Sequence, residues 1–227
     1  MKAIILTKDK ADGLLLRKRI RQLRPNFIEL DCFVKDDVLK LGEQFMDTEY
    51  IFSSWYMPIF DQEEIKKAFP SLKAVFYAAG TVKYFADPFL SFGIRVFSAA
   101  KANGISVAEY TVAQILLANK GYFQAQRSCK SFLWRFAFRK AKKYTDNRQG
   151  NYAAKVGLIG CGAVGSQVVR FLKSYHIEIM VYDPYLSAER CAELGVEQVD
   201  LVTLFESCDV ISNHLPDIQN TKSIINY

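Results

Sequence analysis

The sequence predicts an α/β protein whose parallel sheets carry helices on both faces. Short apolar runs, such as residues 3–6 and 156–159, alternate along the chain with segments in which apolar residues recur at helical spacing. Capping patterns mark helix starts, for example Asp61 followed by Glu64. Because strands that alternate with helices form parallel sheets, each half of this 227-residue chain is expected to form such a unit.

The first hundred residues predict a compact α/β domain over residues 1–100. Strands are expected at residues 3–6, 27–30, 50–53, 72–77 and 95–98. Residues 16–23 show helical spacing and end before Pro25, and residues 61–69 form a capped helix that Pro70 closes.

The middle of the chain predicts a long helix followed by an arm. Ser106 and Glu109 form a capping box at the expected helix start, and residues 108–116 place apolar side chains on one face. Basic and aromatic residues are mixed between residues 120 and 150. Such a mixture can bind nucleic acid, but no recognition motif accompanies it. We therefore favour a solvated helix face backed by a packing or dimer face.

From Lys155 onward the alternation restarts. Strands are expected at residues 156–159, 177–182 and 210–215, and helices at residues 164–172, 187–195 and 201–208. Ser187 and Gly195 have the types expected at the start and end of a helix.

The turn after the first of these strands carries the pattern G-x-G-x-x-G. Gly160 permits the tight turn, Gly162 lets the backbone approach a pyrophosphate, and Gly165 lets the helix pack closely on the strand. Asp183 ends the next strand, about twenty residues on, where a carboxylate can accept hydrogen bonds from a ribose. The pattern therefore predicts a Rossmann unit that prefers NAD to NADP, a preference that the nearby Arg190 slightly weakens.

Composition and cysteine content limit the class of protein further. The chain is half apolar with a net charge of +6, which is typical of a globular protein. Its five cysteines are scattered and accompanied by only two histidines, so we expect reduced thiols and no metal site. Neither a signal peptide nor a membrane span is expected, and the cytoplasm is the default location.

His214 lies at the carboxyl end of the last expected strand, on the edge where open α/β folds bind ligands. It could serve as a catalytic base. No orienting acid is evident, however, and we favour a structural role or a place in the cofactor wall.

Taken together, these motifs resemble the D-isomer-specific 2-hydroxyacid dehydrogenases over nearly the whole chain. The similarity is carried by four ordered groups of residues: Ala78-Ala79-Gly80-Thr81, Asn103 with Ser106-Val107-Ala108-Glu109, the glycine segment at residues 157–165, and the segment at residues 209–216 with Asn220-Thr221-Lys222. Their order and spacing are far more specific than the glycine pattern alone.

The resemblance implies a flavodoxin-like substrate domain at residues 1–100 and a Rossmann domain at residues 101–227, with residues 120–150 as a dimer arm. It implies hydride transfer between NAD(H) and a 2-hydroxy or 2-keto acid in a homodimer that binds neither nucleic acid nor membrane. The implied contacts are Ala79 and Gly80 with a substrate carboxylate, Ala163 and Val164 with the pyrophosphate, Asp183 with the ribose, and Leu215 and Pro216 with the cofactor.

Two departures accompany the resemblance. Val82 stands where many members have an aspartate. The family's catalytic Arg, Glu and His are expected beyond Tyr227, so the Rossmann domain is expected to be incomplete and this chain alone inactive or nearly so. A non-enzymatic NAD(H)-binding regulatory module is the alternative.

Overall fold

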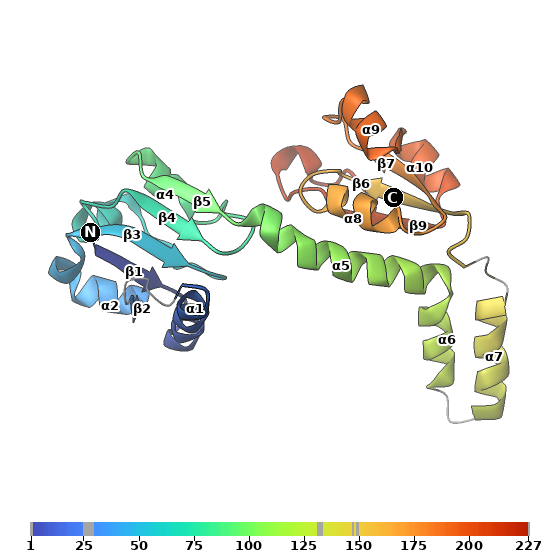
Figure 1. Ribbon diagram of the computed structural model, residues 1–227, viewed down its shortest axis with the longest axis horizontal. Coiled ribbons are helices and arrows are strands. Elements are labelled where there is room, and N and C mark those ends of the chain that lie inside the picture. The colour runs from blue at the N-terminus through green and yellow to red at the C-terminus, as the bar shows by residue number, and fades with distance from the viewer. Residues whose placement is uncertain (1, 25–29, 131–133, 147, 149, 227) are drawn as a thin grey trace. The chain divides into compact units, whose positions relative to one another are not determined.

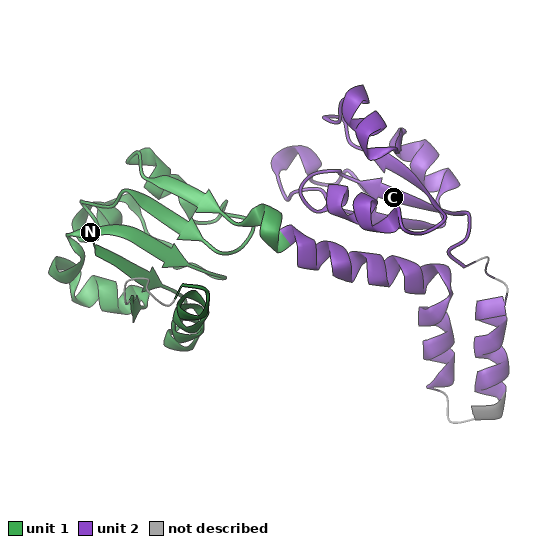
Figure 2. Ribbon diagram, in the orientation of Figure 1, with its two compact units in different colours: residues 1–103 green, residues 104–227 purple. Residues whose placement is uncertain are grey.

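The computed structural model describes residues 2–24, 30–130, 134–146, 148 and 150–226. The chain divides into two compact units, Met1–Asn103 and Gly104–Tyr227, which Figure 2 colours separately. Each unit contains its own parallel sheet with helices packed on it (Figure 1), which confirms the predicted fold class.

The first unit is built on a five-stranded sheet in the order β2-β1-β3-β4-β5, and every neighbouring pair is parallel. This is the flavodoxin-like strand order. The strands are β1 (Lys2–Leu6), β2 (Asp31–Phe33), β3 (Thr48–Ser53), β4 (Ala74–Tyr77) and β5 (Arg95–Ser98).

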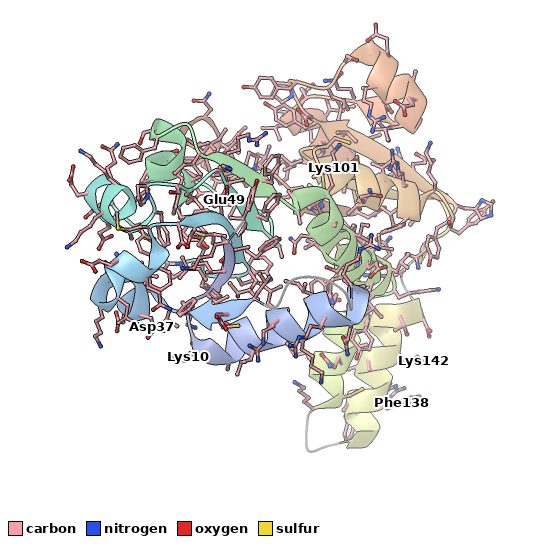
Figure 3. All side chains as sticks on the ribbon, turned by 60° about the vertical axis from the view of Figure 1, so that its left-hand side comes forward. Lys10, Asp37, Glu49, Lys101, Phe138 and Lys142 are labelled. Carbon is pink, nitrogen blue, oxygen red and sulfur yellow. The ribbon has the colours of Figure 1, made fainter. Side chains whose placement is uncertain are left out.

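The helical segments of the first unit are α1 (Lys10–Leu23), α2 (Lys35–Lys40), η1 (Gly42–Phe45), α3 (Gln62–Ala68) and α4 (Ala86–Ser91). The predicted capping box opens α3, because Asp61 accepts from the Glu64 amide at 2.8 Å and Glu64 accepts from the Asp61 amide at 3.0 Å. An ion pair of 3.6 Å joins Lys10 of α1 to Asp37 of α2; both are labelled in Figure 3.

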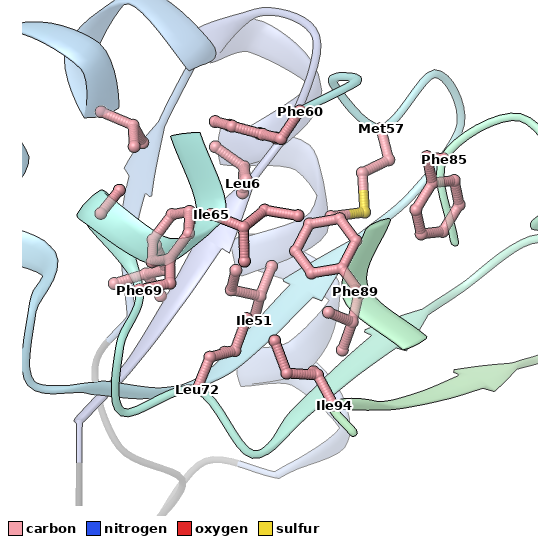
Figure 4. Packing of buried hydrophobic residues seen from close by; sticks show 14 of the residues in the cluster. Leu6, Ile51, Met57, Phe60, Ile65, Phe69, Leu72, Phe85, Phe89 and Ile94 are labelled. Carbon is pink, nitrogen blue, oxygen red and sulfur yellow. The ribbon is translucent and has the colours of Figure 1, made fainter. Parts of the chain in front are cut away.

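The core of this unit lies between the sheet and the helices that follow β2, β3 and β4 (Figure 4). Ile51 of β3 is fully buried, and the rings of Phe60 and Phe69 meet edge to face at 5.8 Å. Burying a side chain of this size stabilises the fold by about 1.5–3 kcal/mol relative to exposure. The apolar alternation seen in the sequence is therefore what holds this unit together.

The second unit has a four-stranded parallel sheet in the order β8-β7-β6-β9. Its strands are β6 (Ala154–Ile159), β7 (Ile177–Tyr182), β8 (Glu197–Gln198) and β9 (Val210–Asn213). The helical segments are α5 (Ala100–Asn119), whose first turn belongs to the first unit, α6 (Tyr122–Cys129), α7 (Trp134–Asp146), α8 (Gly165–Leu172), α9 (Ala188–Leu194), α10 (Leu201–Ser207) and η2 (Gln219–Thr221).

Three predicted boundaries are wrong. The strand predicted at residues 72–77 begins at Ala74. The strand predicted at residues 27–30 falls mostly on residues outside the described part, and the next strand that the structure has is β2 at Asp31–Phe33. The long helix begins at Ala100 rather than Ser106, because the Ser98 hydroxyl accepts from the Ala100 amide at 3.2 Å and alanine favours an earlier start. Strand β9 ends at Asn213 rather than at residue 215, just before a loop that contains Pro216.

Several short elements carry no clear sequence signal. Helices α2 and α4 and strand β8 are too short for a hydrophobic period to be read from the sequence. The five cysteines are all free thiols. No helix in the described ranges combines the length and apolar character needed to cross a membrane.

Candidate dinucleotide site

The glycine turn joins β6 to α8 at the carboxyl edge of the second sheet. The Gly160 amide donates to the Tyr182 carbonyl at 2.8 Å, and the His214 amide donates to the Ile159 carbonyl at 2.8 Å. The ends of β7, β6 and β9 are thereby held side by side. Strand β6 lies between the other two, so the turn sits where open α/β sheets bind ligands.

Two glycines of the turn leave no room for a side chain. Gly160 has a φ of +91°, and a Cβ there would lie 3.1 Å from the His214 carbonyl carbon. A Cβ on Gly165 would lie 2.2 Å from the Gly160 carbonyl oxygen, well inside van der Waals contact. The turn can close on the start of α8 only because both positions lack a side chain.

Gly162 is different, because a Cβ built on it would meet nothing within 4 Å. Gly162 and Ala163 are exposed at the start of α8. The first amides of a helix have no acceptor within it and carry the positive end of the helix dipole. The open space beside Gly162 therefore fits a pyrophosphate approaching the backbone, and these residues suit a dinucleotide.

Asp183 is fixed in place by the turn itself. Its Oδ2 atom accepts from the Cys161 amide at 2.8 Å, and its Oδ1 atom accepts from the Tyr185 amide at 2.9 Å. Its backbone carbonyl accepts from the Gln198 side chain at 2.7 Å. A carboxylate has about four lone-pair positions, so the oriented group can still accept from ribose hydroxyls.

Cys161 faces the interior behind this carboxylate. Burial, followed by the negative charge of Asp183, raises the pKa of the Cys161 thiol to about 11. The thiol is therefore protonated and unreactive at neutral pH. Sequence reasoning assigned this residue no role, whereas its backbone amide is what links the turn to Asp183.

The loop after β9 forms the next wall of the site. The Leu215 amide donates to the Asn213 side chain at 3.0 Å, and Leu215 is the side chain nearest to the position of a Gly160 Cβ, at 3.2 Å. Pro216 follows and is exposed. The His214 ring lies 3.0 Å from the Ser212 hydroxyl, and burial lowers the pKa of His214. This ring is therefore neutral at pH 7.

The predicted substrate loop, with Ala79 and Gly80, lies in the first unit after β4. The Ser98 hydroxyl contacts the carbonyl oxygens of both residues, at 3.0 Å for Ala79, which fixes the orientation of their peptides. The hydroxyls of Tyr77 and Tyr84 lie 3.1 Å apart beside this loop, and burial raises the pKa of Tyr77.

Comparison with known proteins places this geometry in a family. The sequence model of the D-isomer specific 2-hydroxyacid dehydrogenase NAD-binding domain matches residues 112–227. The D-3-phosphoglycerate dehydrogenase of Archaeoglobus fulgidus is 37% identical over 133 residues, which are 59% of this chain and 24% of that protein. The enzyme of the same name from Bacillus subtilis is 30% identical over 165 residues, which are 72% of this chain and 30% of that protein.

Solved structures agree on the fold. The apo-structure of D-lactate dehydrogenase from Escherichia coli has a TM-score of 0.66 at 23% identity and covers 99% of this chain and 68% of that one. The holo D-mandelate dehydrogenase of Rhodotorula graminis has a TM-score of 0.74 at 18% identity, covering 97% of this chain and 67% of that one. Since the family match spans more than half of the sequence, this chain belongs to the D-isomer-specific 2-hydroxyacid dehydrogenase family and contains its NAD-binding domain.

Proposed function

We propose that the protein is an oxidoreductase that transfers hydride between NAD(H) and a 2-hydroxy or 2-keto acid. The chain spans less than a third of the length of the curated relatives named above. The observation that carries the proposal is the open space beside Gly162, at the start of α8 and close to the oriented carboxylate of Asp183. The names of the relatives support a dehydrogenase over a regulatory module.

In this proposal the amides of Ala163 and Val164 hold the pyrophosphate, and Asp183 accepts from the adenosine ribose. Leu215 and Pro216 form the wall against which the cofactor rests. The amides of Ala79 and Gly80, in the first unit, bind the carboxylate of the acid. Bound NADH would supply the hydride, and we assign no proton-transfer role to His214, whose ring pairs with Ser212.

Calorimetric titration with NADH and NADPH tests the cofactor site. We expect the wild-type protein to bind NADH more tightly, because a 2′-phosphate would meet the Asp183 carboxylate. In Asp183→Asn, the affinity for NADH should fall about tenfold, which is the loss typical of a charge-assisted hydrogen bond. The ratio of NADH affinity to NADPH affinity should decrease as well. The asparagine oxygen can still accept from the Cys161 amide, which retains the turn, while the hydrogen bond from the Tyr185 amide is lost. Equal affinity of the wild-type protein for both cofactors would contradict the role of Asp183.

We also propose a homodimer formed through the arm at residues 120–150, and a cytoplasmic location, which the five free thiols support. Helices α6 and α7 form the arm, and it exposes 71% of Phe136 and 65% of Phe138. Aromatic side chains this exposed are enriched at protein interfaces.

Sedimentation velocity tests the dimer. The double variant Phe136→Ser, Phe138→Ser is expected to shift the protein to monomer at micromolar concentration, because an aromatic side chain that is a hot spot of an interface carries about 2 kcal/mol or more. Phe92→Ser, which removes a 45% exposed ring from the first unit, is the matched control and should remain dimeric. A wild-type protein that sediments as a monomer would exclude the proposed assembly.

A further inference from the structure

A second concave site lies at the base of the arm, where α5 ends and α7 ends. It is a pocket of about 740 Å³ within the second unit. This volume is in the range of small-molecule sites. The lining residues are Asn119, Lys140, Lys143, Tyr144, Arg148, Gly150 and Asp209.

This pocket lies at the opposite edge of the sheet from the glycine turn. Asp209 immediately precedes β9, and its side chain accepts from the amide of Lys155, the second residue of β6, at 3.0 Å. The glycine turn follows the other end of β6. A strand of six residues spans about 20 Å, so the two sites are separate.

The base of the arm is a fixed structure. Gly121 has a φ of +67°, and a Cβ there would lie 2.5 Å from the Tyr144 carbonyl oxygen, so the start of α6 rests directly on the end of α7. Helices α6 and α7 run side by side in both views (Figures 1 and 3). The side chains at the end of α7 are therefore held close to the end of α5.

The pocket is strongly cationic. Lys140, Lys143 and Arg148 line it, and the Lys120 ammonium would lie 2.7 Å from a Cβ on Gly150, which is also in the lining. None of these four side chains forms an ion pair within the described part of the chain. Among the described lining residues, Asp209 is the single acidic one. Four cations gathered in this way repel one another, and a bound anion would relieve the repulsion.

The pocket also contains a buried hydrogen-bond acceptor that has no donor, and this feature restricts the kind of ligand that fits. Asn119 is 3% exposed, and its Oδ1 atom has no hydrogen-bond partner among the described residues. Its amide orientation follows from its neighbour: the Asn119 Nδ2 atom donates to Asn151 at 3.0 Å, and Asn151 in turn donates to the Leu116 carbonyl. An unpaired buried carbonyl costs about 1–3 kcal/mol. Because solvent does not reach the Asn119 Oδ1 atom, a ligand hydroxyl can remove that cost only if the Asn119 side chain turns toward the pocket.

We propose that this pocket binds a small phosphorylated compound that also carries a hydroxyl group. The phosphate, with close to two negative charges at neutral pH, is held by Lys140, Lys143 and Arg148. The hydroxyl donates to Asn119, whose side chain turns toward the pocket to meet it. A small molecule fits better than nucleic acid, because the unpaired acceptor is buried within a pocket and not spread along an extended basic surface.

Calorimetry at low salt with glycerol 3-phosphate as the probe tests this site. The wild-type chain is expected to bind it, and Lys143→Gln and Arg148→Gln are each expected to weaken binding about tenfold, as for one charge-assisted contact. Lys142→Gln is the matched control. Lys142 is next to Lys143 on α7, lies one turn from Phe138 (Figure 3) and pairs with Asp146 at 4.0 Å outside the pocket, so its removal should leave affinity unchanged.

Two further comparisons define the ligand. Ethyl phosphate, which lacks the hydroxyls, should bind at least about fivefold more weakly, because it cannot donate to Asn119. Gly162→Val, which alters only the glycine turn, should bind glycerol 3-phosphate as the wild type does. The proposal is overturned if glycerol 3-phosphate does not bind, if Lys142→Gln weakens binding as much as Lys143→Gln, or if ethyl phosphate binds equally well. Steeply salt-dependent binding of an RNA oligonucleotide without binding of the small phosphate would also overturn it.

Discussion

Replacing Gly162 with valine is expected to abolish NADH binding while leaving the fold intact. A Cβ on Gly162 meets nothing within 4 Å, and the residue does not need a positive φ, so a Cβ is accommodated without strain. The same open space is where the pyrophosphate must approach the backbone. Excluding it removes at least two charge-assisted hydrogen bonds of about 1.5–3 kcal/mol each, so affinity should fall at least about 100-fold.

Calorimetric titration with NADH measures the expected loss of binding, and a thermal unfolding curve shows whether the fold is intact. Gly42→Val is the matched control, since a Cβ on Gly42 would also meet nothing within 4 Å but this residue lies in the first unit. It should bind NADH like the wild-type protein. Wild-type affinity in Gly162→Val would mean that the pyrophosphate does not lie beside this residue.

Gly165→Ala, unlike Gly162→Val, is expected to lower the stability of the fold by a large amount. A Cβ there would lie 2.2 Å from the Gly160 carbonyl oxygen, which belongs to the backbone and cannot rotate away. Alanine gains about 1 kcal/mol in helix propensity over glycine. Overpacking costs typically 1–3 kcal/mol and more where backbone must move, so the clash outweighs the gain.

We expect the second unit of Gly165→Ala to lose about 2–3 kcal/mol of its free energy of unfolding, which lowers its Tm by about 10 °C. Because the chain has two compact units, the transition should be followed by a probe within the second, such as hydrogen exchange of β6 amides. Gly162→Ala, which adds the same methyl group to open space, should leave the Tm of the second unit unchanged. A Tm for Gly165→Ala within about 2 °C of the wild type would show that the turn adapts at little cost.

The fold class could be predicted from the sequence because its signals are local. A buried strand, a glycine turn and an acid at the end of the next strand follow one another within one βαβ unit, and the structure has β6, α8 and β7 there. The capping box at Asp61 has the same local character. The serine and glutamate at positions 106 and 109 have the same spacing but lie inside α5, because the Ser98 hydroxyl and favourable alanines start the helix earlier.

The parts of the site that sequence could not predict depend on pairs distant along the chain. The Cys161 amide meets Asp183 across the sheet edge, 22 positions away. Asn119 meets Asn151 only after the arm has folded back on itself. No period or spacing encodes such contacts, since they depend on how whole elements pack. The cationic pocket was therefore visible in the sequence only as a basic stretch.

The hydrogen bond from the Cys161 amide to Asp183 limits how coenzyme preference can change. The carboxylate proposed to select NAD also braces the turn proposed to hold the pyrophosphate. A substitution that removes the acceptor together with the charge, such as Asp183→Ala, would release the brace at the same time. A change of coenzyme preference is therefore tolerable only with a residue at position 183, such as asparagine, that still accepts from the Cys161 amide.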